Sequence, residues 1–286
     1  MQNFNEANLT DVVLASHAGT RDPRLKEIVT GLIRHLHAFM REIEPTEAEW
    51  FEAIKFLTAV GHKCDDKRQE FILLSDTLGV SMLVDAINHR KPAGATETTV
   101  FGPFHRAGAP PKRFGDSIAN GAAGEPTVVL GRVLTVDGKP IAGAELDVWQ
   151  VDGDGLYDVQ RPELTAMQMR GKFRADSEGR FLFRTVKPVS YSIPTDGPVG
   201  ALLRATGRHA FRPAHIHMIV SAPGYRPVIT HLFVAGDPYL DSDAVFAVKQ
   251  TLIVDFKKHK AGTAPGGAAM IQDYWTAEYD FRLTPA

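Results

Sequence analysis

Glycine and proline are unevenly distributed along these 286 residues, and this most constrains the fold. Residues 1–91 hold four of the 25 glycines and two of the 18 prolines, so the first third favours helices and the rest favours turns. A chain this long can bury a core without disulfide bonds. We therefore predict an α+β protein with a helical domain, residues 1–100, followed by a β-rich domain, residues 101–286.

Helix start and stop signals divide the first domain. Asp22, followed directly by a proline, is a predicted N-cap, and apolar residues then follow helical spacing until Pro45. Thr46 and Glu49 form a capping box ahead of a second helix, and the apolar run 71–87 predicts a third. Three amphipathic helices make a thin core, so their apolar faces need the second domain or a second copy of the chain.

After residue 126 the chain consists of short segments in which apolar and polar residues alternate. Residues 128–136 and 144–151, on either side of the Asp137-Gly138 turn, predict a β-hairpin. Further segments of this kind follow at spacings typical of a sandwich, at 173–186, 215–222 and 229–236. The second domain is therefore predicted to be an antiparallel β-sandwich.

Composition excludes several classes of protein. The net charge of −2 does not suit binding to nucleic acid, and no stretch approaches the roughly 20 apolar residues of a membrane span. The first residues lack the basic and apolar regions of a signal peptide. Together with the single cysteine, Cys64, this leads us to expect a cytoplasmic protein.

His215 and His217 are the most informative pair of residues, because alternation along a strand points both imidazoles to one face. An H-x-H triplet alone is equally consistent with two histidines that lie on the surface or form ordinary hydrogen bonds without a metal. With one cysteine, further ligands would have to be oxygens, and a tyrosine phenolate favours a trivalent ion such as Fe(III). Tyr157 and Tyr191 lie in turn-rich stretches that follow predicted strands, although either alone could be a half-buried rim aromatic.

Several motifs together resemble those of the intradiol ring-cleaving dioxygenases, and the resemblance covers essentially the whole chain. The motifs are LDVWQ, GLYDVQ, YSIP at 191–194, GRHAFRPAHIHMIVSAPGY at 207–225 and GPFHRAGAP at 102–110. The resemblance implies that Tyr157, Tyr191, His215 and His217 hold one non-haem Fe(III) per subunit, with a hydroxide in the remaining position. The helical leader is similar to the family's dimerisation domain, which implies a homodimer, with phospholipid in a channel between the helices.

The resemblance also implies a reaction between an aromatic diol or triol and O2. The diol displaces the hydroxide and Tyr191, which accept its protons, and Arg212 is expected to stabilise negative charge on the ring. A surface salt bridge is the alternative for Arg212. The pocket walls implied for a flat aromatic ring are mostly apolar, namely Leu73, Val100, Phe101, Gly102, Pro103, Phe104, Ile193, Pro194 and Val245.

Within the family, the chain is most similar to the branch that cleaves hydroxyquinol (benzene-1,2,4-triol), through residues 70–76, 99–104, 191–200 and 237–246. Asp76 falls at a pocket position that is apolar in catechol-cleaving relatives, and it could accept a hydrogen bond from a third ring hydroxyl. The alternative for Asp76 is a solvated carboxylate on a helix face. His231 stands where catechol-cleaving members more often have glutamine, and it is either a hydrogen-bond donor behind the ligands or a further site histidine.

The expected product from hydroxyquinol is 3-hydroxy-cis,cis-muconate, which tautomerises to maleylacetate. Two other functions stay open at this point. One is catechol 1,2-dioxygenase activity, which shares the fold, the metal and the chemistry. The other is a non-catalytic transthyretin-like binding module, because the segment GRVLTVDGKPIAGAELDVW is also typical of sandwich domains without an active site.

Overall fold

The computed structural model describes residues 3–66 and 68–286. The chain forms two compact units, one ending at Ala59 and the other running from Val60 to Ala286. The units divide earlier than the boundary predicted at residue 100, and residues before that boundary, Leu73 and Met82, belong to an apolar cluster with Phe233 and Val245 of the second unit. Over the described residues, no helix is both long and apolar enough to cross a membrane.

The first unit is helical. It contains α1 (Leu9–Ser16), α2 (Pro23–Ile43) and most of α3 (Glu47–His62). The predicted N-cap is confirmed, since the Asp22 carboxylate accepts hydrogen bonds from the backbone N–H groups of Arg24 and Leu25 at 2.8 and 3.0 Å. The predicted capping box is also confirmed, because Thr46 N donates to Glu49 Oε2 at 2.8 Å and Glu49 N donates to Thr46 Oγ1 at 3.3 Å. Helix α1 was not predicted.

The single helix predicted over 71–87 is wrong. The chain instead forms α4 (Glu70–Thr77) and α5 (Val80–Asn88), separated by Gly79 in the left-handed conformation with φ of 74°. A left-handed residue ends an α-helix, and glycine adopts it without steric cost. A further short helix that the apolar pattern did not reveal, α6 (Pro198–Ala205), lies between β5 and β6 and contacts α4.

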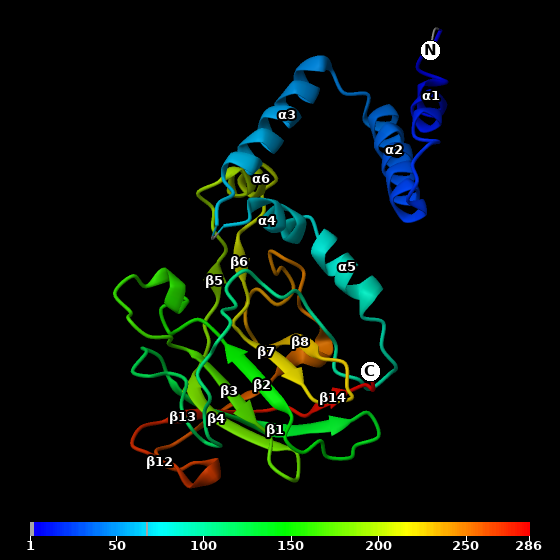
Figure 1. Ribbon diagram of the computed structural model, residues 1–286. Coiled ribbons are helices and arrows are strands. Elements are labelled where there is room, and N and C mark those ends of the chain that lie inside the picture. The colour runs from blue at the N-terminus through cyan, green and yellow to red at the C-terminus, as the bar shows by residue number, and fades with distance from the viewer. Residues whose placement is uncertain (1–2, 67) are drawn as a thin grey trace. The chain divides into compact units, whose positions relative to one another are not determined.

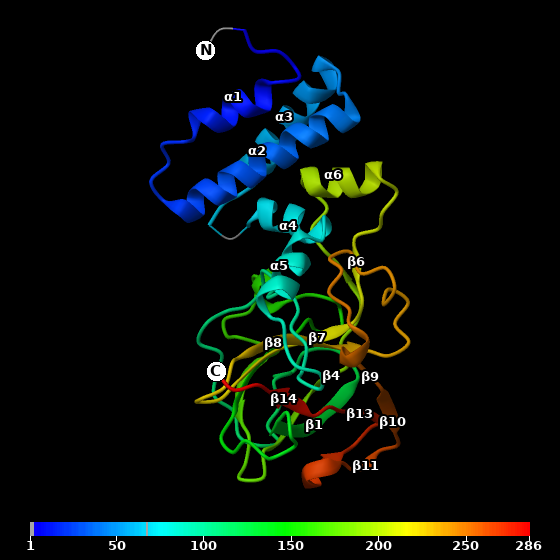
Figure 2. The ribbon, with the colours of Figure 1, turned by 90° about the vertical axis from the view of Figure 1, so that its right-hand side faces the viewer.

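Two sheets form the sandwich (Figures 1 and 2). The first sheet has the order β10 (Phe256–His259), β13 (Tyr274–Glu278), β1 (Pro126–Thr135), β14 (Phe281–Leu283), with β4 (Arg180–Val186) also paired to β1. The second has the order β3 (Arg170–Arg174), β2 (Glu145–Trp149), β7 (His215–Ser221), β8 (Val228–Val234), β9 (Ile253–Val254). Most pairs are antiparallel as predicted, and β1–β13, β1–β14 and β8–β9 are parallel.

Two short ribbons complete the strands, β5 (Tyr191–Ser192) with β6 (Phe211–Arg212), and β11 (Gly262–Thr263) with β12 (Ala269–Met270). The hairpin predicted around Asp137-Gly138 forms only at its turn, where Thr135 N donates to Lys139 O at 2.8 Å. Beyond the turn, β1 and β2 enter different sheets. Their apolar side chains, such as Val129 and Val148, then belong to one core between the sheets instead of lying side by side in one sheet.

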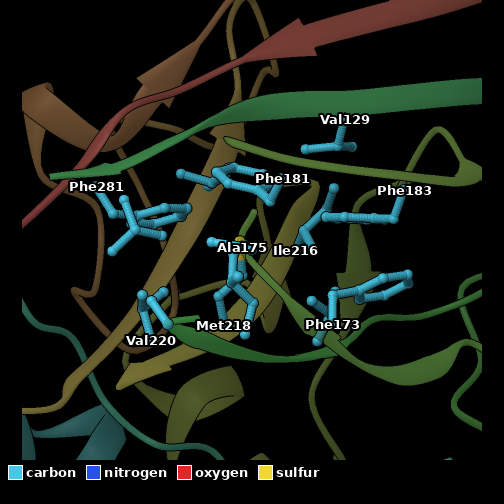
Figure 3. Close-up of a cluster of buried hydrophobic side chains, with 14 of the residues drawn as sticks. Val129, Phe173, Ala175, Phe181, Phe183, Ile216, Met218, Val220 and Phe281 are labelled. Atoms are coloured by element: carbon cyan, nitrogen blue, oxygen red, sulfur yellow. The ribbon is translucent and has the colours of Figure 1, made fainter. Parts of the chain in front are cut away.

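Figure 3 shows this core, which forms where the inner faces of the two sheets meet. Val129, Phe181 and Phe281 come from the first sheet, and Phe173 and Met218 come from the second. Together with their buried neighbours these side chains account for the stability of the sandwich, since burying each large apolar side chain contributes about 1.5–3 kcal/mol.

The alternation of β7 places the candidate site on the other face of the second sheet. Ile216, Met218 and Val220 point into the core, so the neighbouring His215 and His217 point away from it. The pairing register aligns His217 with Trp149 of β2 and with His231 of β8, which brings three buried rings together on that face. The predicted common face for the two histidines is therefore confirmed.

Candidate metal centre and pocket

Four polar side chains from three parts of the chain converge on the outer face of the second sheet. Tyr157 Oη lies 3.0 Å from Tyr191 Oη and 2.9 Å from His217 Nε2. His215 Nε2 lies 3.1 Å from His217 Nε2 and 3.5 Å from Tyr191 Oη. All four residues are buried. The structure therefore excludes the alternatives that the tyrosines are half-buried at the edge of the site and that the histidines lie on the surface.

The hydrogen bond at the far side of the His215 ring defines its tautomer. His215 Nδ1 lies 2.7 Å from the carbonyl oxygen of Pro213, which can only accept, so Nδ1 carries the proton. Nε2 therefore presents a lone pair toward the tyrosines and His217. An imidazole that is fixed in this way by a backbone carbonyl is a common arrangement for a metal-binding histidine.

His231 contacts the far side of the His217 ring. His231 Nε2 lies 2.7 Å from His217 Nδ1, and His231 Nδ1 lies 2.5 Å from Thr99 Oγ1. If Nε2 of His217 presents a lone pair, the Nδ1–H of His217 donates to Nε2 of His231. The Nδ1–H of His231 then donates to the hydroxyl of Thr99. The geometry favours His231 as the partner that orients His217, because its Nε2 is already engaged there, but in this arrangement His231 accepts from His217 instead of donating to it as expected.

Burial determines the protonation states of these groups. It holds the pKa of His215, His217 and His231 well below the usual value of 6.5, so the three imidazoles stay neutral and keep their lone pairs. Burial, and then the neighbouring Tyr191, raise the pKa of the Tyr157 hydroxyl well above 10. Tyr157 therefore becomes a phenolate only if a strong cation binds beside it.

The donor set fits a metal ion. Metal–ligand bonds of about 2 Å place neighbouring ligand atoms about 3 Å apart, and the four donor atoms already have such spacings. Possible ligand atoms of His215, His217 and His231 lie within 4.8 Å of one another. Two phenol oxygens with two imidazole nitrogens, and no thiolate, suit a hard trivalent ion better than zinc.

Aromatic rings hold two of the candidate ligands from the side. Phe104 stacks on Tyr157 with ring centroids 4.5 Å apart, and Trp149 stacks on His217 at 4.7 Å. Gly102, with φ of 77°, lies so close that an added Cβ would be 3.0 Å from His217 Cε1. Only glycine combines this backbone conformation with this close approach.

Arg212 is buried beside the ligand set. Its Nε donates to Asp243 Oδ1 at 3.2 Å, and its Nη1 lies 3.2 Å from His215 Nε2. Burial alone would lower the pKa of the guanidinium, but Asp243 outweighs burial and keeps the pKa above the usual value. Arg212 is therefore a permanent buried cation, and the alternative of a surface salt bridge is wrong.

The remaining predicted residues form the surroundings of this centre. Leu73, Val100, Ile193 and Val245 belong to one apolar cluster that also contains Phe233. Pro194, next to Ile193, is half-buried, and the ring of Phe101 packs on Trp149 with centroids 5.9 Å apart while Phe101 remains 43 % exposed. A cavity of about 410 Å³ is lined by Asp76, Ser81, Asp85, Thr99 and residues 100–103, among others.

Asp76 lies on the wall of this cavity with only 6 % of its surface exposed, so the alternative of a solvated carboxylate is wrong. Burial raises the pKa of Asp76 above 3.8, while a hydrogen bond with Ser81 and the charge of Arg212 oppose the rise. Sequence reasoning missed Asp243, Thr99 and Trp149. All three lay inside quoted motifs or stretches, but no spacing indicated that they contact the ligands or Arg212.

Comparison with known proteins places these observations in a family. Residues 102–285 match the family model described as Dioxygenase, and residues 22–96 match the model described as Catechol dioxygenase N terminus. The chain is 53% identical over 285 residues to 6-chlorohydroxyquinol 1,2-dioxygenase of Cupriavidus pinatubonensis, covering 100% of this chain and 99% of that one.

Solved structures agree with the sequence comparison. The crystal structure of hydroxyquinol 1,2-dioxygenase from Pseudomonas putida superposes with a TM-score of 0.94 at 52% identity, covering 98% of this chain and 99% of that one. Catechol 1,2-dioxygenase from an Acinetobacter species superposes with a TM-score of 0.84 at 29% identity, covering 100% and 94%.

Proposed function

Because this chain belongs to the intradiol ring-cleavage dioxygenase family, we propose that it cleaves hydroxyquinol with O2 between two adjacent hydroxylated carbons. The product is 3-hydroxy-cis,cis-muconate, which tautomerises to maleylacetate. Relatives named for cleavage of hydroxyquinol or 6-chlorohydroxyquinol match 98 to 100% of the chain at 46 to 53% identity, which supports this substrate over catechol.

The observation that carries the substrate assignment is the buried carboxylate of Asp76 on the wall of a cavity that is also lined by Val100, Phe101 and Pro103. A third ring hydroxyl can donate a hydrogen bond to this carboxylate, and catechol has no such hydroxyl. Ser81 pairs with only part of this carboxylate, and a remaining buried acceptor site that stays unpaired costs about 1–3 kcal/mol, so the pocket discriminates against the diol that lacks the donor.

The family depends on iron, and the centre contains a buried cluster of histidines. We propose one Fe(III) per subunit, held by Tyr157, Tyr191, His215 and His217, whose donor atoms and protonation states fit such an ion. When bound, the ion supplies Lewis acidity that makes the ring hydroxyls more acidic and draws electron density from the ring, so that the ring reacts with O2.

The protein side chains divide the remaining tasks. With the ion bound, Tyr191 would be a phenolate, and its Oη would take a proton from an entering ring hydroxyl, since Tyr191 is the more accessible tyrosine, 8 % exposed against 1 % for Tyr157. Tyr157 stays in place because Phe104 stacks on its ring and its backbone N–H donates to Gln160 Oε1 at 3.0 Å. Arg212 offers a fixed positive charge to the ring as negative charge develops there, with no solvent reorganisation.

Oxygen uptake by the iron-loaded protein tests the assignment. Hydroxyquinol and catechol are compared at equal concentration, after the autoxidation of hydroxyquinol has been subtracted. We expect fast uptake with hydroxyquinol and little with catechol. A preference for catechol would instead support catechol 1,2-dioxygenase activity. No uptake with either compound, together with no iron after gentle purification, would support a non-catalytic transthyretin-like binding module.

We also propose a homodimer formed through the helical unit. Helix α2 has no buried residue, and its apolar side chains follow one stripe that stays exposed in the helical unit, at Leu25, Ile28, Leu32, Leu36 and Phe39. A stripe of this size needs a partner, and a second copy supplies the same surface. Light scattering should give twice the 31.3 kDa mass of one chain, and extraction of the purified dimer should release phospholipid.

A cytoplasmic location completes the proposal. Cys64, the only cysteine, is half-buried, and its Sγ lies 3.4 Å from the carbonyl oxygen of Val60. A single thiol without a disulfide partner suits a reducing compartment. Cell fractionation with an antibody against the protein tests this location.

A further inference from the structure

Asp243 makes four hydrogen bonds through one buried carboxylate. Oδ1 accepts from Arg212 Nε at 3.2 Å and from Val245 N at 3.3 Å. Oδ2 accepts from Ala247 N at 3.0 Å and from Arg212 Nη2 at 3.5 Å. The side chains of Asp243 and Arg212 are 2 % and 4 % exposed, so this ion pair is shielded from water.

The pairing uses one edge of the guanidinium and leaves the other edge free for the site. Because Asp243 takes Nε and Nη2, Nη1 is the nitrogen that faces the candidate ligands, and it lies 3.2 Å from His215 Nε2. A planar guanidinium held along one edge by a carboxylate has little freedom to rotate. Asp243 therefore determines where the free N–H groups of Arg212 point.

The same carboxylate shapes the loop after β8. Its bonds to the N–H groups of Val245 and Ala247 close a turn in which Phe246 adopts φ of 58°. A left-handed conformation costs an aromatic residue of order 1 kcal/mol or more, so such a turn persists only where its surroundings hold it. Val245, on this turn, belongs to the apolar cluster beside the site.

We propose that Asp243 is a positioning residue for ring cleavage, which aims Arg212 at the reacting ring. This inference rests on the proposed function. Asp243 does not itself touch the ring, and it acts through Arg212. Removing its charge leaves a buried cation without its partner and free to turn away from the ring.

A double-mutant cycle tests the inference. The variants Arg212→Met, Asp243→Asn and the double variant are loaded with iron and compared by kcat, KM, iron content and Tm. Asp243→Asn should lower kcat about 10- to 100-fold with unchanged iron content, because a misplaced group costs about that much. If Asp243 acts through Arg212, the kcat of the double variant should equal that of Arg212→Met within about twofold.

Losses that multiply in the double variant would overturn the inference, because they would show that Asp243 acts independently of Arg212. Wild-type activity in Asp243→Asn would also overturn it. Asp241→Asn is the matched control, since Asp241 is an exposed carboxylate in the same loop and should keep wild-type kcat and Tm. If Asp243→Asn does not fold, Asp243→Glu takes its place in the cycle, because it keeps the buried charge and moves it by one methylene group.

The wild-type protein separates this inference from the proposed function. Absence of oxygen uptake by the iron-loaded wild type with both hydroxyquinol and catechol would show that the proposed function is wrong. Uptake by the wild type together with independent losses in the cycle would overturn only the role of Asp243.

Discussion

Both faces of β7 are buried in its first half, from His215 to Met218, and they serve different ends. Ile216, Met218 and Val220 point into the sandwich core with 0 % of their surface exposed, while His215 and His217 on the other face are only 1 % and 2 % exposed. Burial therefore does not distinguish the stabilising face from the candidate catalytic face. The difference lies in the neighbours, which are apolar on the inner face and hydrogen-bonding on the outer face.

This difference has an energetic consequence. An apolar side chain gains free energy from burial directly, whereas a buried polar group costs free energy unless each donor and acceptor is paired. The outer face pairs its imidazoles through Pro213 O, His231 and Thr99. Substitutions on the inner face should therefore change stability, and substitutions on the outer face should change metal binding and rate.

Neighbouring residues of β7 provide the largest expected contrast. His217→Ala removes a candidate ligand, and we expect more than a thousandfold loss of kcat, since changes behind a ligand already cost about 10- to 100-fold. Met218→Ala creates a cavity in the core and should cost about 2–5 kcal/mol of unfolding free energy, with kcat per bound iron near that of the wild type. Denaturant unfolding, iron analysis and oxygen uptake are measured for both variants.

Equal losses of activity per iron in these two variants would break the comparison between the faces. Retained iron and activity in His217→Ala would show that His217 is not a ligand. The unfolding of both variants is measured without iron, so that the contribution of the metal to stability does not enter the difference.

The pH dependence of stability should also come from the outer face. Burial depresses the pKa of His215, His217 and His231, so below pH 6.5 the unfolded chain binds protons that the folded chain cannot bind. The stability of the iron-free protein is then complete above this pH and falls as the pH decreases, by about 1.4 kcal/mol per pH unit for each histidine. Three such histidines give a slope of about 4 kcal/mol per pH unit.

Urea unfolding of the iron-free protein at about pH 7.5 and about pH 5.5 tests this slope, and the three histidines should give a total difference of about 4 kcal/mol because the slope is only half developed at pH 6.5. His231→Gln removes one of the three titrating rings, and the slope should fall by about one third. A wild-type stability that does not decrease toward the lower pH would contradict neutral buried imidazoles.

Asp76 extends the comparison to the substrate. Asp76→Leu removes the buried acceptor, and the ratio of kcat/KM for hydroxyquinol to kcat/KM for catechol should fall about 100-fold. Asp76→Asn keeps an acceptor oxygen of nearly the same shape and should keep most of the preference. An unchanged ratio in Asp76→Leu would show that another residue recognises the third hydroxyl.

Local patterns predicted the parts of the molecule that local physics determines. The cap at Asp22 and the common face of His215 and His217 depend on neighbours within a few residues, and both could be predicted from the sequence. The two sheets could be expected from alternating segments. The break between α4 and α5 could not, because the apolar run continues through Gly79 although its backbone is left-handed.

Contacts in the site between residues that are distant in sequence could not be predicted. Thr99 contacts His231 from 132 residues away, and Asp243 pairs with Arg212 from 31 residues away. Such pairs depend on how loops cross the sheet, and residue spacing does not encode this. The resemblance to a family supplied the candidate ligands, whereas the residues that orient His217 and Arg212 became visible only in the structure.

Two buried threonines give the smallest and most specific test. Thr99→Val leaves the Nδ1–H of His231 without an acceptor, so it should cost about 1 kcal/mol of stability and weaken iron binding about tenfold. Thr230 is equally buried, on the inner face of β8, and its Oγ1 has no hydrogen-bond partner among the described residues. Thr230→Val should therefore be neutral or stabilising, because it removes an unpaired hydroxyl and fills the same volume. Iron affinity and urea midpoints are measured for both variants. If the two substitutions change iron affinity and stability equally, the hydrogen bonds behind His217 do not distinguish the two faces of the sheet. The difference between the faces would then depend on the metal ligands alone.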